Sequence, residues 1–304
     1  LDVARTFFDK ATVMRYIDWL SRHKINKLHW HLTDDDGWRI EIKQYPELTA
    51  KGAWRGPGET SPTAYGSGEK RYGGFYTQDE IREVIRYAAF RNIEIIPEID
   101  LPGHSRAARG AYPEIFCKTT GAEPAPELMR NVWCAGREEN FEMLQNILQE
   151  IAALFPSPYI HIGGDEVSYR YWRACPRCKA VMHKHGMQNA SQLQGYFMGR
   201  LEEIVRKEGK RCGAWNEVLK SKSDTTMLIY GWENTDACRE ALQKGYPLVA
   251  MPGSYLYIDM KQSPFERGHT WAWLVDTRRV YSFDPGRLAP SAASAGLIRG
   301  VESA

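Results

Sequence analysis

Residues 159–167 read Tyr159-Ile160-His161-Ile162-Gly163-Gly164-Asp165-Glu166-Val167, and this stretch decides the fold that we expect. The apolar run up to Ile162 is typical of a strand that is buried on both faces of a parallel sheet. The two glycines let the backbone turn where a ligand can approach closely. Asp165 and Glu166 then fall at the carboxyl end of the strand, which carries the chemistry in α/β barrels. Taken alone, the stretch could also be a solvated loop with two acids.

Strands and helices alternate on both sides of this stretch. We expect strands at 1–5, 26–33, 93–99, 159–162, 211–215, 227–232 and 247–251, and helices at 11–23, 77–91, 139–154, 171–186, 191–208 and 235–244. This order predicts parallel strands joined by right-handed crossovers. Two long polar connections, at 55–74 and 105–138, fit the rims or lids of a site.

The length of 304 residues fits an α/β barrel, which typically has roughly 250 residues before insertions. Seven strands are evident, and the candidate for the eighth is 297–302, two residues before the end. We therefore expect one catalytic TIM (β/α)8 barrel over residues 1–304, with the eighth strand incomplete because the sequence is cut there. Since Leu1 is neither a start methionine nor the head of a signal peptide, we expect a longer precursor.

The composition narrows the classes of partner. With 43% hydrophobic and 26% charged residues, it is typical of a soluble globular protein. A formal net charge of +2 gives no reason to expect nucleic acid or an acidic membrane as partner, and no apolar run approaches the roughly 20 residues that cross a bilayer. Ten tryptophans and sixteen tyrosines exceed what a core needs, and such rings suit walls that contact sugars.

Six cysteines occur, at positions 117, 134, 175, 178, 212 and 238. The sequence Cys175-Pro-Arg-Cys178 has the spacing of a metal knuckle, but no second Cys-x-x-Cys pair accompanies it, so we predict no metal site. Cys117 and Cys134 bracket a loop rich in glycine and proline. A disulfide between them would close this loop if the protein is exported.

Polar and aromatic residues gather at the carboxyl ends of the expected strands, which a barrel brings around one mouth. A chance distribution would have placed some of them at the opposite ends. The sequence therefore predicts one site at this mouth. Its candidate residues are Arg5, Asp34, His104, Asp165, Glu166, Trp215, Trp232, Tyr257 and Asp259.

Adjacent carboxylates are awkward for a double displacement, which needs them about 5 Å apart on opposite sides of the sugar. Neighbouring side chains on a strand point in divergent directions, so Asp165 and Glu166 reach one substrate only from the same side of the anomeric carbon. A 2-acetamido sugar removes this difficulty because its own carbonyl oxygen can attack C1. One acid then protonates the leaving oxygen, and the other orients the acetamido N–H.

Four motifs, in the same order, resemble those of glycoside hydrolase family 20, the β-N-acetylhexosaminidases. The resemblance covers practically the whole chain. It implies retaining hydrolysis of terminal, non-reducing β-linked GlcNAc or GalNAc through an oxazolinium intermediate, without a cofactor. It also implies a small α/β domain before the barrel, and a tryptophan and a glutamate beyond residue 304. The motifs are Leu1-Asp2-Val3-Ala4-Arg5, His29-Trp30-His31-Leu32-Thr33-Asp34-Asp35-Asp36-Gly37-Trp38-Arg39, Glu98-Ile99-Asp100-Leu101-Pro102-Gly103-His104 and His161-Ile162-Gly163-Gly164-Asp165-Glu166.

The resemblance assigns roles to the charged candidates. Glu166 matches the general acid, which later acts as base. Asp165 matches the residue that positions the acetamido group and stabilises the oxazolinium. Asp34 and His104 match supporting residues that tune the protonation of the acid. Arg5 matches the arginine that holds the O3 and O4 hydroxyls of the sugar, and it could equally pair with a buried acid.

The remaining candidates match the sugar-binding part of the family site. Trp215 and Trp232 match walls of the acetamido pocket, although such rings can also be core residues. Tyr257 matches the residue that donates its hydroxyl to the acetamido oxygen, and Asp259 matches a nearby substrate contact. Trp38 and Arg39 are interpreted as structural.

Three other interpretations stay open. His29 and His31, with His104 and His161, could form the metal site of a metal-dependent hydrolase barrel. The chain could be a carbohydrate-binding barrel that has lost catalysis, or a retaining glycosidase with two separated carboxylates. The sequence leaves the choice between GlcNAc and GalNAc, the accepted linkage and the oligomeric state open. Export to a periplasm, a lysosome or the outside is expected from the family.

Overall fold

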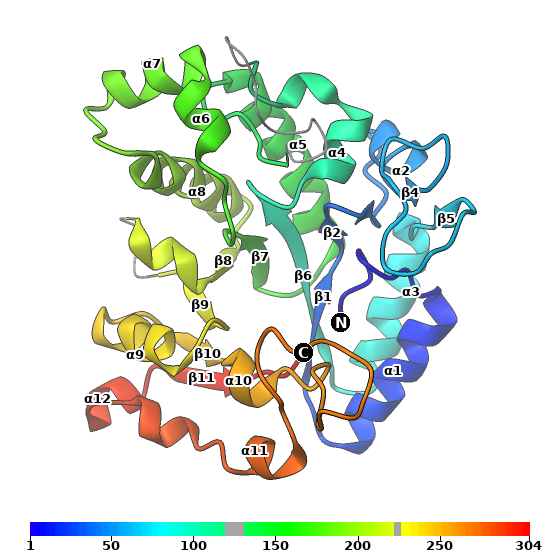
Figure 1. Ribbon diagram of the computed structural model, residues 1–304, viewed down its shortest axis with the longest axis vertical. Helices are drawn as coiled ribbons and strands as arrows, with labels where there is room; N and C mark the ends of the chain where they lie inside the picture. Colours follow the sequence, from blue (N-terminus) through cyan, green and yellow to red (C-terminus); the bar gives the residue numbers. More distant parts are fainter. Residues whose placement is uncertain (119–130, 222–225) are drawn as a thin grey trace. The chain divides into compact units, whose positions relative to one another are not determined.

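The computed structural model of the protein describes residues 1–118, 131–221 and 226–304 (Figure 1). The chain divides into two compact units, Leu1–Arg211 and Cys212–Ala304. Both units are built from parallel strands that alternate with helices, as the sequence predicts.

The first unit carries three parallel strands in the order β1-β6-β7. Their bounds are Lys27–His31 for β1, Glu94–Leu101 for β6 and Tyr159–Gly163 for β7. The strand predicted at 1–5 is reduced to a parallel bridge between Asp2 and His31. It ends early because the Asp2 carboxylate accepts hydrogen bonds from the backbone N–H groups of Ala4 and Arg5, both at 2.9 Å, which turns the chain.

The structure contains the helices predicted in the first unit, with one correction, and adds the short helices α2 and α4. Helix α3 begins where the sequence predicts, with a capping box in which Thr77 and Glu80 each accept a hydrogen bond from the backbone of the other. The single helix predicted at 171–186 is two helices, α6 and α7. Proline has no N–H and fits the first turn of a helix, so Pro176 begins α7 and ends α6. The bounds are α1 Lys10–Arg22, α2 Glu47–Ala50, α3 Gln78–Ala89, α4 Arg106–Ala111, α5 Glu138–Leu154, α6 Arg170–Ala174, α7 Pro176–Lys184 and α8 Ala190–Lys207.

The long connections of the first unit contain short elements of their own. Two antiparallel pairs, β2 with β3 and β4 with β5, lie between β1 and α3. In the connection predicted at 105–138, α4 and a 3-10 helix precede residues 119–130, which lie outside the described residues. The bounds are β2 Thr33–Asp34, β3 Gly37–Trp38, β4 Trp54–Arg55, β5 Tyr72–Gly73 and η1 Pro113–Ile115.

The second unit carries four parallel strands in the order β8-β9-β10-β11. Strand β11 lies within the range predicted for the eighth strand. The bounds are β8 Arg211–Trp215, η3 Asn216–Lys220, β9 Leu228–Gly231, α9 Thr235–Gln243, β10 Leu248–Ala250, α10 Gly253–Leu256, α11 Thr277–Tyr281, η4 Pro285–Leu288, α12 Ala292–Ala295 and β11 Ile298–Val301.

The buried strands and helices form the core that holds the strand ends in place. In β6 every residue after Glu94 is buried, which is typical of a parallel strand covered on both faces. Helix α5 buries Leu144, Ile147, Leu148 and Ile151 at the spacing of one helical face. Each such side chain contributes roughly 1.5–3 kcal/mol when buried. This core fixes the positions of the strand ends, where the polar groups lie.

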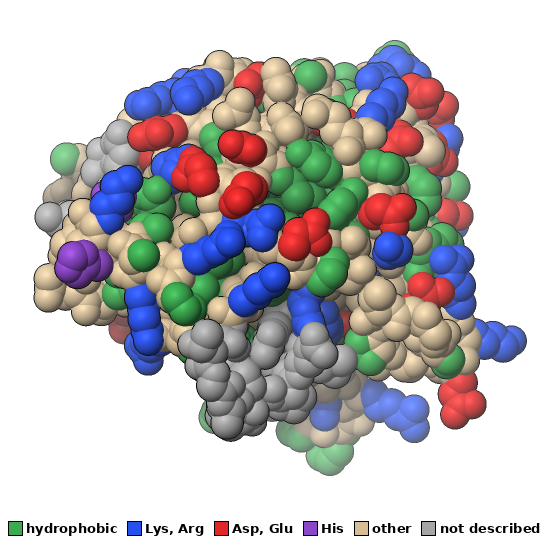
Figure 2. Space-filling view, turned by 90° about the horizontal axis from the view of Figure 1, so that it is seen from above, with side chains coloured by type: hydrophobic (Ala, Val, Ile, Leu, Met, Phe, Trp, Pro, Cys, Tyr) green, Lys and Arg blue, Asp and Glu red, His purple; other side chains and the backbone are tan. Residues whose placement is uncertain are grey.

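Two surface properties follow from the structure. Among the described residues, no helix combines the length and the apolar character needed to span a bilayer. On the face shown in Figure 2, basic and acidic side chains are interspersed, in keeping with the formal net charge of +2.

Candidate active site

The turn after β7 brings the two adjacent carboxylates together. Gly163 and Gly164 have φ angles of 72° and 103°, and a side chain on Gly163 would place its Cβ 1.9 Å from Asp100 Oδ1. Glu166 is itself left-handed, with φ of 45°. As a result, Asp165 Oδ2 and Glu166 Oε2 lie 3.3 Å and 3.4 Å from the same atom, His104 Nε2. The predicted divergence of the two side chains is therefore wrong, whereas their access from one side agrees with the prediction.

Four of the predicted residues form a row of alternating charge that leads to Glu166. The Arg5 guanidinium lies 2.7 Å from Asp34 Oδ2, so this arginine does pair with a buried acid. Asp34 Oδ1 lies 3.5 Å from His104 Nδ1. The imidazole of His104 thus lies between Asp34 on one side and Asp165 and Glu166 on the other.

The charges in this row stabilise one another against burial. Burial opposes ionisation of Asp34, but Arg5 and then His104 hold the pKa of Asp34 well below its usual value. Burial likewise opposes protonation of His104, yet the carboxylates of Asp165 and Asp34 raise the pKa of His104 well above 6.5. For Asp165, burial is outweighed by His104, and the pKa of Asp165 is lowered. The site therefore holds an imidazolium between ionised aspartates.

Asp100 is a site residue that the sequence analysis did not single out. Its side chain is buried on β6 and, with His104 and Asp165, forms a group whose polar atoms lie within 4.8 Å of one another. Burial and then the charge of Asp165 raise the pKa of Asp100 well above its usual value. The raised pKa favours the protonated form of Asp100, and the interaction of Asp100 with Asp165 favours the ionised form of Asp165. The available signal was two acids, Glu98 and Asp100, in alternate positions of an otherwise apolar strand.

Three of the four histidines considered for a metal site contact Glu98 instead. Glu98 Oε2 lies 3.0 Å from His29 Nε2 and 2.6 Å from His31 Nδ1, and Oε1 lies 3.1 Å from His161 Nδ1. Burial opposes these charges, but Glu98 raises the pKa of His31 and the histidines lower the pKa of Glu98. The fourth, His104, contacts the aspartates. This geometry favours packing and support of the acids as the role of the histidines.

Arg39, which was interpreted as structural, fixes the segment that carries Arg5. It is fully buried, and its guanidinium donates hydrogen bonds to five backbone carbonyls. Two of these acceptors, Val3 and Ala4, immediately precede Arg5, with distances of 2.9 Å and 2.6 Å. Arg55 adds a hydrogen bond of 2.5 Å to the carbonyl of Arg5. The position of Arg5 therefore depends on two buried arginines.

The second unit holds the remaining predicted residues. Trp215 ends β8 and Trp232 follows β9, and both rings are half-buried. The indole N–H of Trp232 donates to Glu217 Oε2 at 3.1 Å, and the ring centroid of Tyr257 lies 6.3 Å from that of Trp232. Asp259 is exposed two residues after Tyr257.

A further ring completes this aromatic group. The centroid of Trp271 lies 5.9 Å from that of Trp232 and 5.1 Å from that of Tyr257, in edge-on contacts. Its side chain is largely exposed, which is unusual for tryptophan. The sequence analysis missed Trp271, because no strand end or motif marks it.

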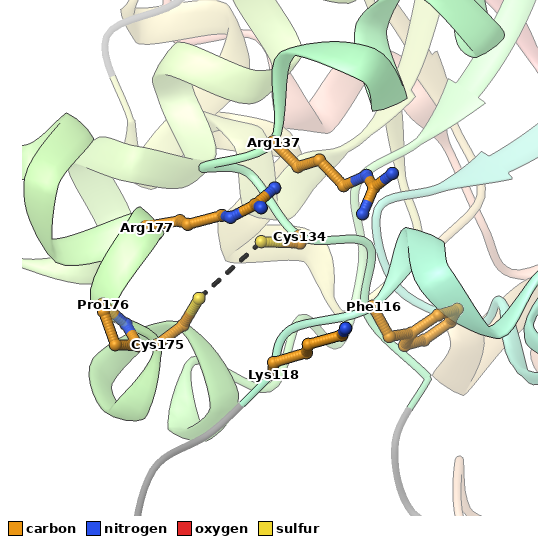
Figure 3. Close-up of a pocket in the computed structure, with 7 residues that line it drawn as sticks. All are labelled: Phe116, Lys118, Cys134, Arg137, Cys175, Pro176 and Arg177. Atoms are coloured by element: carbon orange, nitrogen blue, oxygen red, sulfur yellow. Dashed lines mark hydrogen bonds between the residues drawn. The ribbon is translucent and has the colours of Figure 1, made fainter.

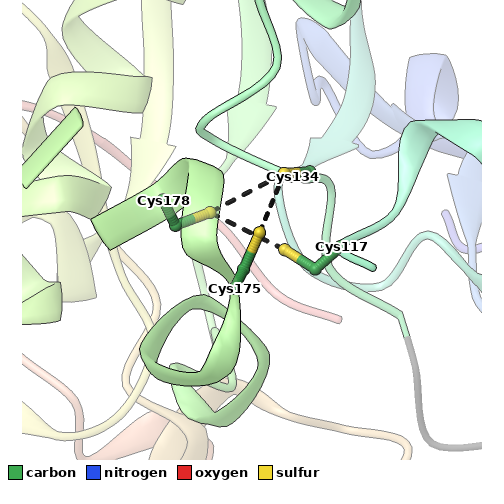
Figure 4. Close-up of side chains that lie close together, drawn as sticks. All are labelled: Cys117, Cys134, Cys175 and Cys178. Carbon is green, nitrogen blue, oxygen red and sulfur yellow. Dashed lines mark hydrogen bonds between the residues drawn. The ribbon is translucent and has the colours of Figure 1, made fainter. Parts of the chain in front are cut away.

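The structure has no disulfide between Cys117 and Cys134, the pair that the sequence analysis considered for an exported protein. Neither Cys117 nor Cys134 forms a disulfide. The Cys117 Sγ lies 3.7 Å from the Cys178 Sγ, and the Cys134 Sγ lies 3.8 Å and 3.7 Å from those of Cys175 and Cys178 (Figure 4). The sequence contains no second Cys-x-x-Cys pair, but the fold brings Cys117 and Cys134 to the knuckle formed by Cys175 and Cys178.

Comparison with known proteins decides the family. The family described as "Glycosyl hydrolase family 20, catalytic domain" matches residues 1–304. The chain belongs to glycoside hydrolase family 20. Its fold is accordingly the TIM (β/α)8 barrel that the sequence predicted.

Relatives of this family 20 chain are similar along most of its length. Over 94% of its length the chain is 42% identical to a β-hexosaminidase of Vibrio furnissii, of which it covers 48%. Over 94% of its length it is 36% identical to a β-hexosaminidase of Porphyromonas gingivalis, of which it covers 36%. The chain thus spans about half the length of the Vibrio furnissii protein and about a third of the Porphyromonas gingivalis protein. A crystal structure of a Vibrio harveyi exo-β-N-acetylglucosaminidase with N-acetylglucosamine matches 99% of the chain and 48% of that protein, with 40% identity and a TM-score of 0.93.

Proposed function

We propose that the protein is an exo-acting, retaining β-N-acetylhexosaminidase that uses the acetamido group of its substrate as nucleophile. The observation that carries this proposal is the contact of Asp165 and Glu166 with one nitrogen of His104, at 3.3 Å and 3.4 Å. Two carboxylates on one side of a site cannot act as acid and opposing nucleophile. They can act as acid and as an anchor for a nucleophile that the sugar supplies.

Glu166 is suited to the role of general acid and then base. Its side chain is 60% exposed, so it can reach a glycosidic oxygen and later a water molecule. In the first step it gives its proton to the leaving oxygen while the acetamido oxygen bonds to C1. In the second step it takes a proton from the water that attacks C1 and reopens the ring, which restores the starting proton and retains the configuration.

Asp165 is suited to stabilise the positive charge that forms on the acetamido group. Its lowered pKa favours the ionised form, and its Oδ2 lies 3.3 Å from His104 Nε2. A fixed carboxylate of this kind accepts a hydrogen bond from the acetamido N–H and aims the carbonyl oxygen at C1. Because its partners are in place before the reaction, little reorganisation is needed as charge develops.

For the sugar contacts we propose the roles that the family resemblance implies. Arg5 pairs with Asp34 but keeps 35% of its side chain exposed, which leaves donors for the O3 and O4 hydroxyls. In the second unit, Trp215, Trp232 and Tyr257 would line the acetamido pocket, and Asp259 would contact a hydroxyl. Such a mixture of aromatic faces and a few polar groups is typical of sugar sites.

The relatives support this substrate class. The Vibrio harveyi protein is described as an exo-β-N-acetylglucosaminidase, and one aspartate-to-alanine mutant of it is described as inactive. A Streptomyces plicatus enzyme that is 32% identical, with a TM-score of 0.80, is described as a β-hexosaminidase in complex with GlcNAc.

Hydrolysis of nitrophenyl β-GlcNAc and β-GalNAc glycosides by the natural full-length protein tests the proposal. Glu166→Gln should abolish turnover, Asp165→Asn should reduce it strongly, and Asp79→Asn, an exposed acid on α3, should leave it unchanged. A thiazoline that mimics the cyclic intermediate should inhibit competitively. A folded protein that turns over neither glycoside would instead indicate a binding barrel, and turnover without thiazoline inhibition would indicate a mechanism with two separated carboxylates.

A further inference from the structure

Four cysteines from two separate segments meet in one buried cluster in the first unit, which we call the cysteine cluster. Its members are Cys117 and Cys134 in the connection between β6 and α5, and Cys175 and Cys178 at the start of α7. All four side chains are buried, and their sulfur atoms lie within 4.8 Å of one another (Figure 4). Neither the proposed hydrolysis nor the sugar contacts use any of them.

The distances in the cysteine cluster fit a single tetrahedral ion. Three of its Sγ–Sγ distances are 3.7 Å, 3.7 Å and 3.8 Å. Four thiolates at about 2.3 Å from one zinc ion lie about 3.8 Å apart, which is the edge of that tetrahedron. A disulfide needs about 2.05 Å between its sulfurs. A cluster of several iron atoms would spread the thiolates further apart than this.

The backbone around the cysteine cluster is arranged to hold this geometry. An antiparallel bridge between Phe116 and Trp133 places Cys134 opposite Ile115, where its N–H donates to the Ile115 carbonyl at 2.9 Å, so Cys117 and Cys134 lie diagonally across the bridge. The side chain of Asn140 donates to the carbonyls of Ile115 and Cys134, at 2.7 Å and 3.0 Å, and so fixes both strands of this connection.

A glycine allows the two cysteine-bearing segments to meet. A Cβ on Gly136 would lie 2.3–2.5 Å from the peptide that joins Arg177 to Cys178, which no side chain could occupy. The loop after Cys134 therefore packs directly on the knuckle.

The surroundings also suit a metal with four thiolates. Such a site carries two net negative charges, and Lys118, Arg137 and Arg177 line a cavity of about 220 Å³ that reaches Cys134 and Cys175 (Figure 3). Positive groups around a thiolate site stabilise the ionised ligands. The cavity gives an ion a path to the sulfurs.

We propose that the cysteine cluster binds one structural Zn²⁺ ion through all four thiolates. Zinc is the ion that a closed tetrahedral set of four sulfurs favours. The ion joins the connection after β6, downstream of His104, to the helix pair after β7, downstream of Asp165 and Glu166. The indole N–H of Trp172 on α6 already donates to the carbonyl of Trp133 at 2.8 Å, next to Cys134. Zinc would thus hold together the two segments that directly follow His104 and the pair Asp165 and Glu166.

Metal analysis of the natural full-length protein, purified without chelator, tests this proposal. We expect about one zinc per chain, and a mercurial thiol reagent should release it as the cluster thiols react. Replacement by Co²⁺ should give the absorption of a tetrahedral cobalt–thiolate site. Cys175→Ser should lose most of the zinc and lower the midpoint of thermal unfolding.

A matched control is Cys238→Ser, which replaces a buried free cysteine outside the cluster whose Sγ donates to the Gly231 carbonyl. It should keep the zinc. Wild-type protein with four reactive thiols and no metal, or with disulfides among these cysteines, would overturn the proposal even if Cys175→Ser fails to fold. One iron per chain in place of zinc would overturn the choice of ion, and equal loss of zinc in Cys238→Ser would overturn the ligand set.

Discussion

Replacement of Asp100 tests whether a protonated carboxyl supports Asp165. Asp100→Asn keeps a donor of the same shape, so turnover of nitrophenyl β-GlcNAc should stay within about threefold of wild type. Asp100→Leu removes the donor that the protonated carboxyl offers to Asp165. Such a bond to a charged group contributes about 1.5–3 kcal/mol. Because 1.36 kcal/mol corresponds to tenfold in rate, kcat/KM should fall roughly 10- to 150-fold.

The pH profile separates this effect from simple loss of structure. The donor favours the ionised form of Asp165, so Asp100→Leu should raise the pKa of Asp165 and move the acid limb of kcat/KM to higher pH. Asp100→Asn should leave that limb in place, and Asp79→Asn serves as the surface control. Equal losses in Asp100→Asn and Asp100→Leu, with no shift of the acid limb in either, would refute the role of Asp100 as a proton donor.

Three further predictions concern stability and binding. Arg39→Met leaves five carbonyls without their donor and should lower the free energy of unfolding in urea by roughly 3 kcal/mol or more, whereas Arg82→Met on the surface should change it by less than about 1 kcal/mol. The lowered pKa of Asp34 means that its stabilisation is present above about pH 4 and is lost as the pH falls through that pKa. The raised pKa of His104 means that its stabilisation is present below about pH 6.5 and is lost as the pH rises through that pKa. The free energy of unfolding in urea should therefore be greatest between about pH 4 and pH 6.5. A free energy that does not change with pH would contradict the roles of both Asp34 and His104. Trp232→Ala should weaken competitive inhibition by the thiazoline by roughly tenfold, equivalent to about 1.4 kcal/mol, and an unchanged inhibition constant would exclude this ring from the pocket.

The sequence predicted those features that depend on local pattern. Helix starts such as Thr77 follow from capping chemistry within four residues, and the strand that ends before Asp165 follows from its apolar run and its glycines. The shortened strand at the start of the chain was missed because the competing hydrogen bonds of Asp2 cannot be read from periodicity. The break in the helix at Pro176 was readable in principle, since proline favours the first turn of a helix.

Features that depend on long-range packing were out of reach. Cys117 and Cys134 occur singly in the sequence, and it is the packing around the antiparallel bridge between Phe116 and Trp133 that brings both to the knuckle. The sequence therefore showed that Cys117 and Cys134 could be neighbours, but not that they approach Cys175 and Cys178. The state of Asp100 depends on its burial against Asp165, which no spacing reveals.

The measurement that tests the account most directly is the rate of hydrolysis for a series of nitrophenyl β-glucosaminides whose N-acyl group carries zero, one, two or three fluorine atoms. If the acetamido oxygen is the nucleophile, each fluorine lowers its basicity, and kcat/KM should fall steeply along the series while the matching β-glucoside is not hydrolysed. A rate that is independent of fluorination, or turnover of the β-glucoside at a similar rate, would show that the nucleophile comes from the protein and would contradict the assignment of Asp165 and Glu166.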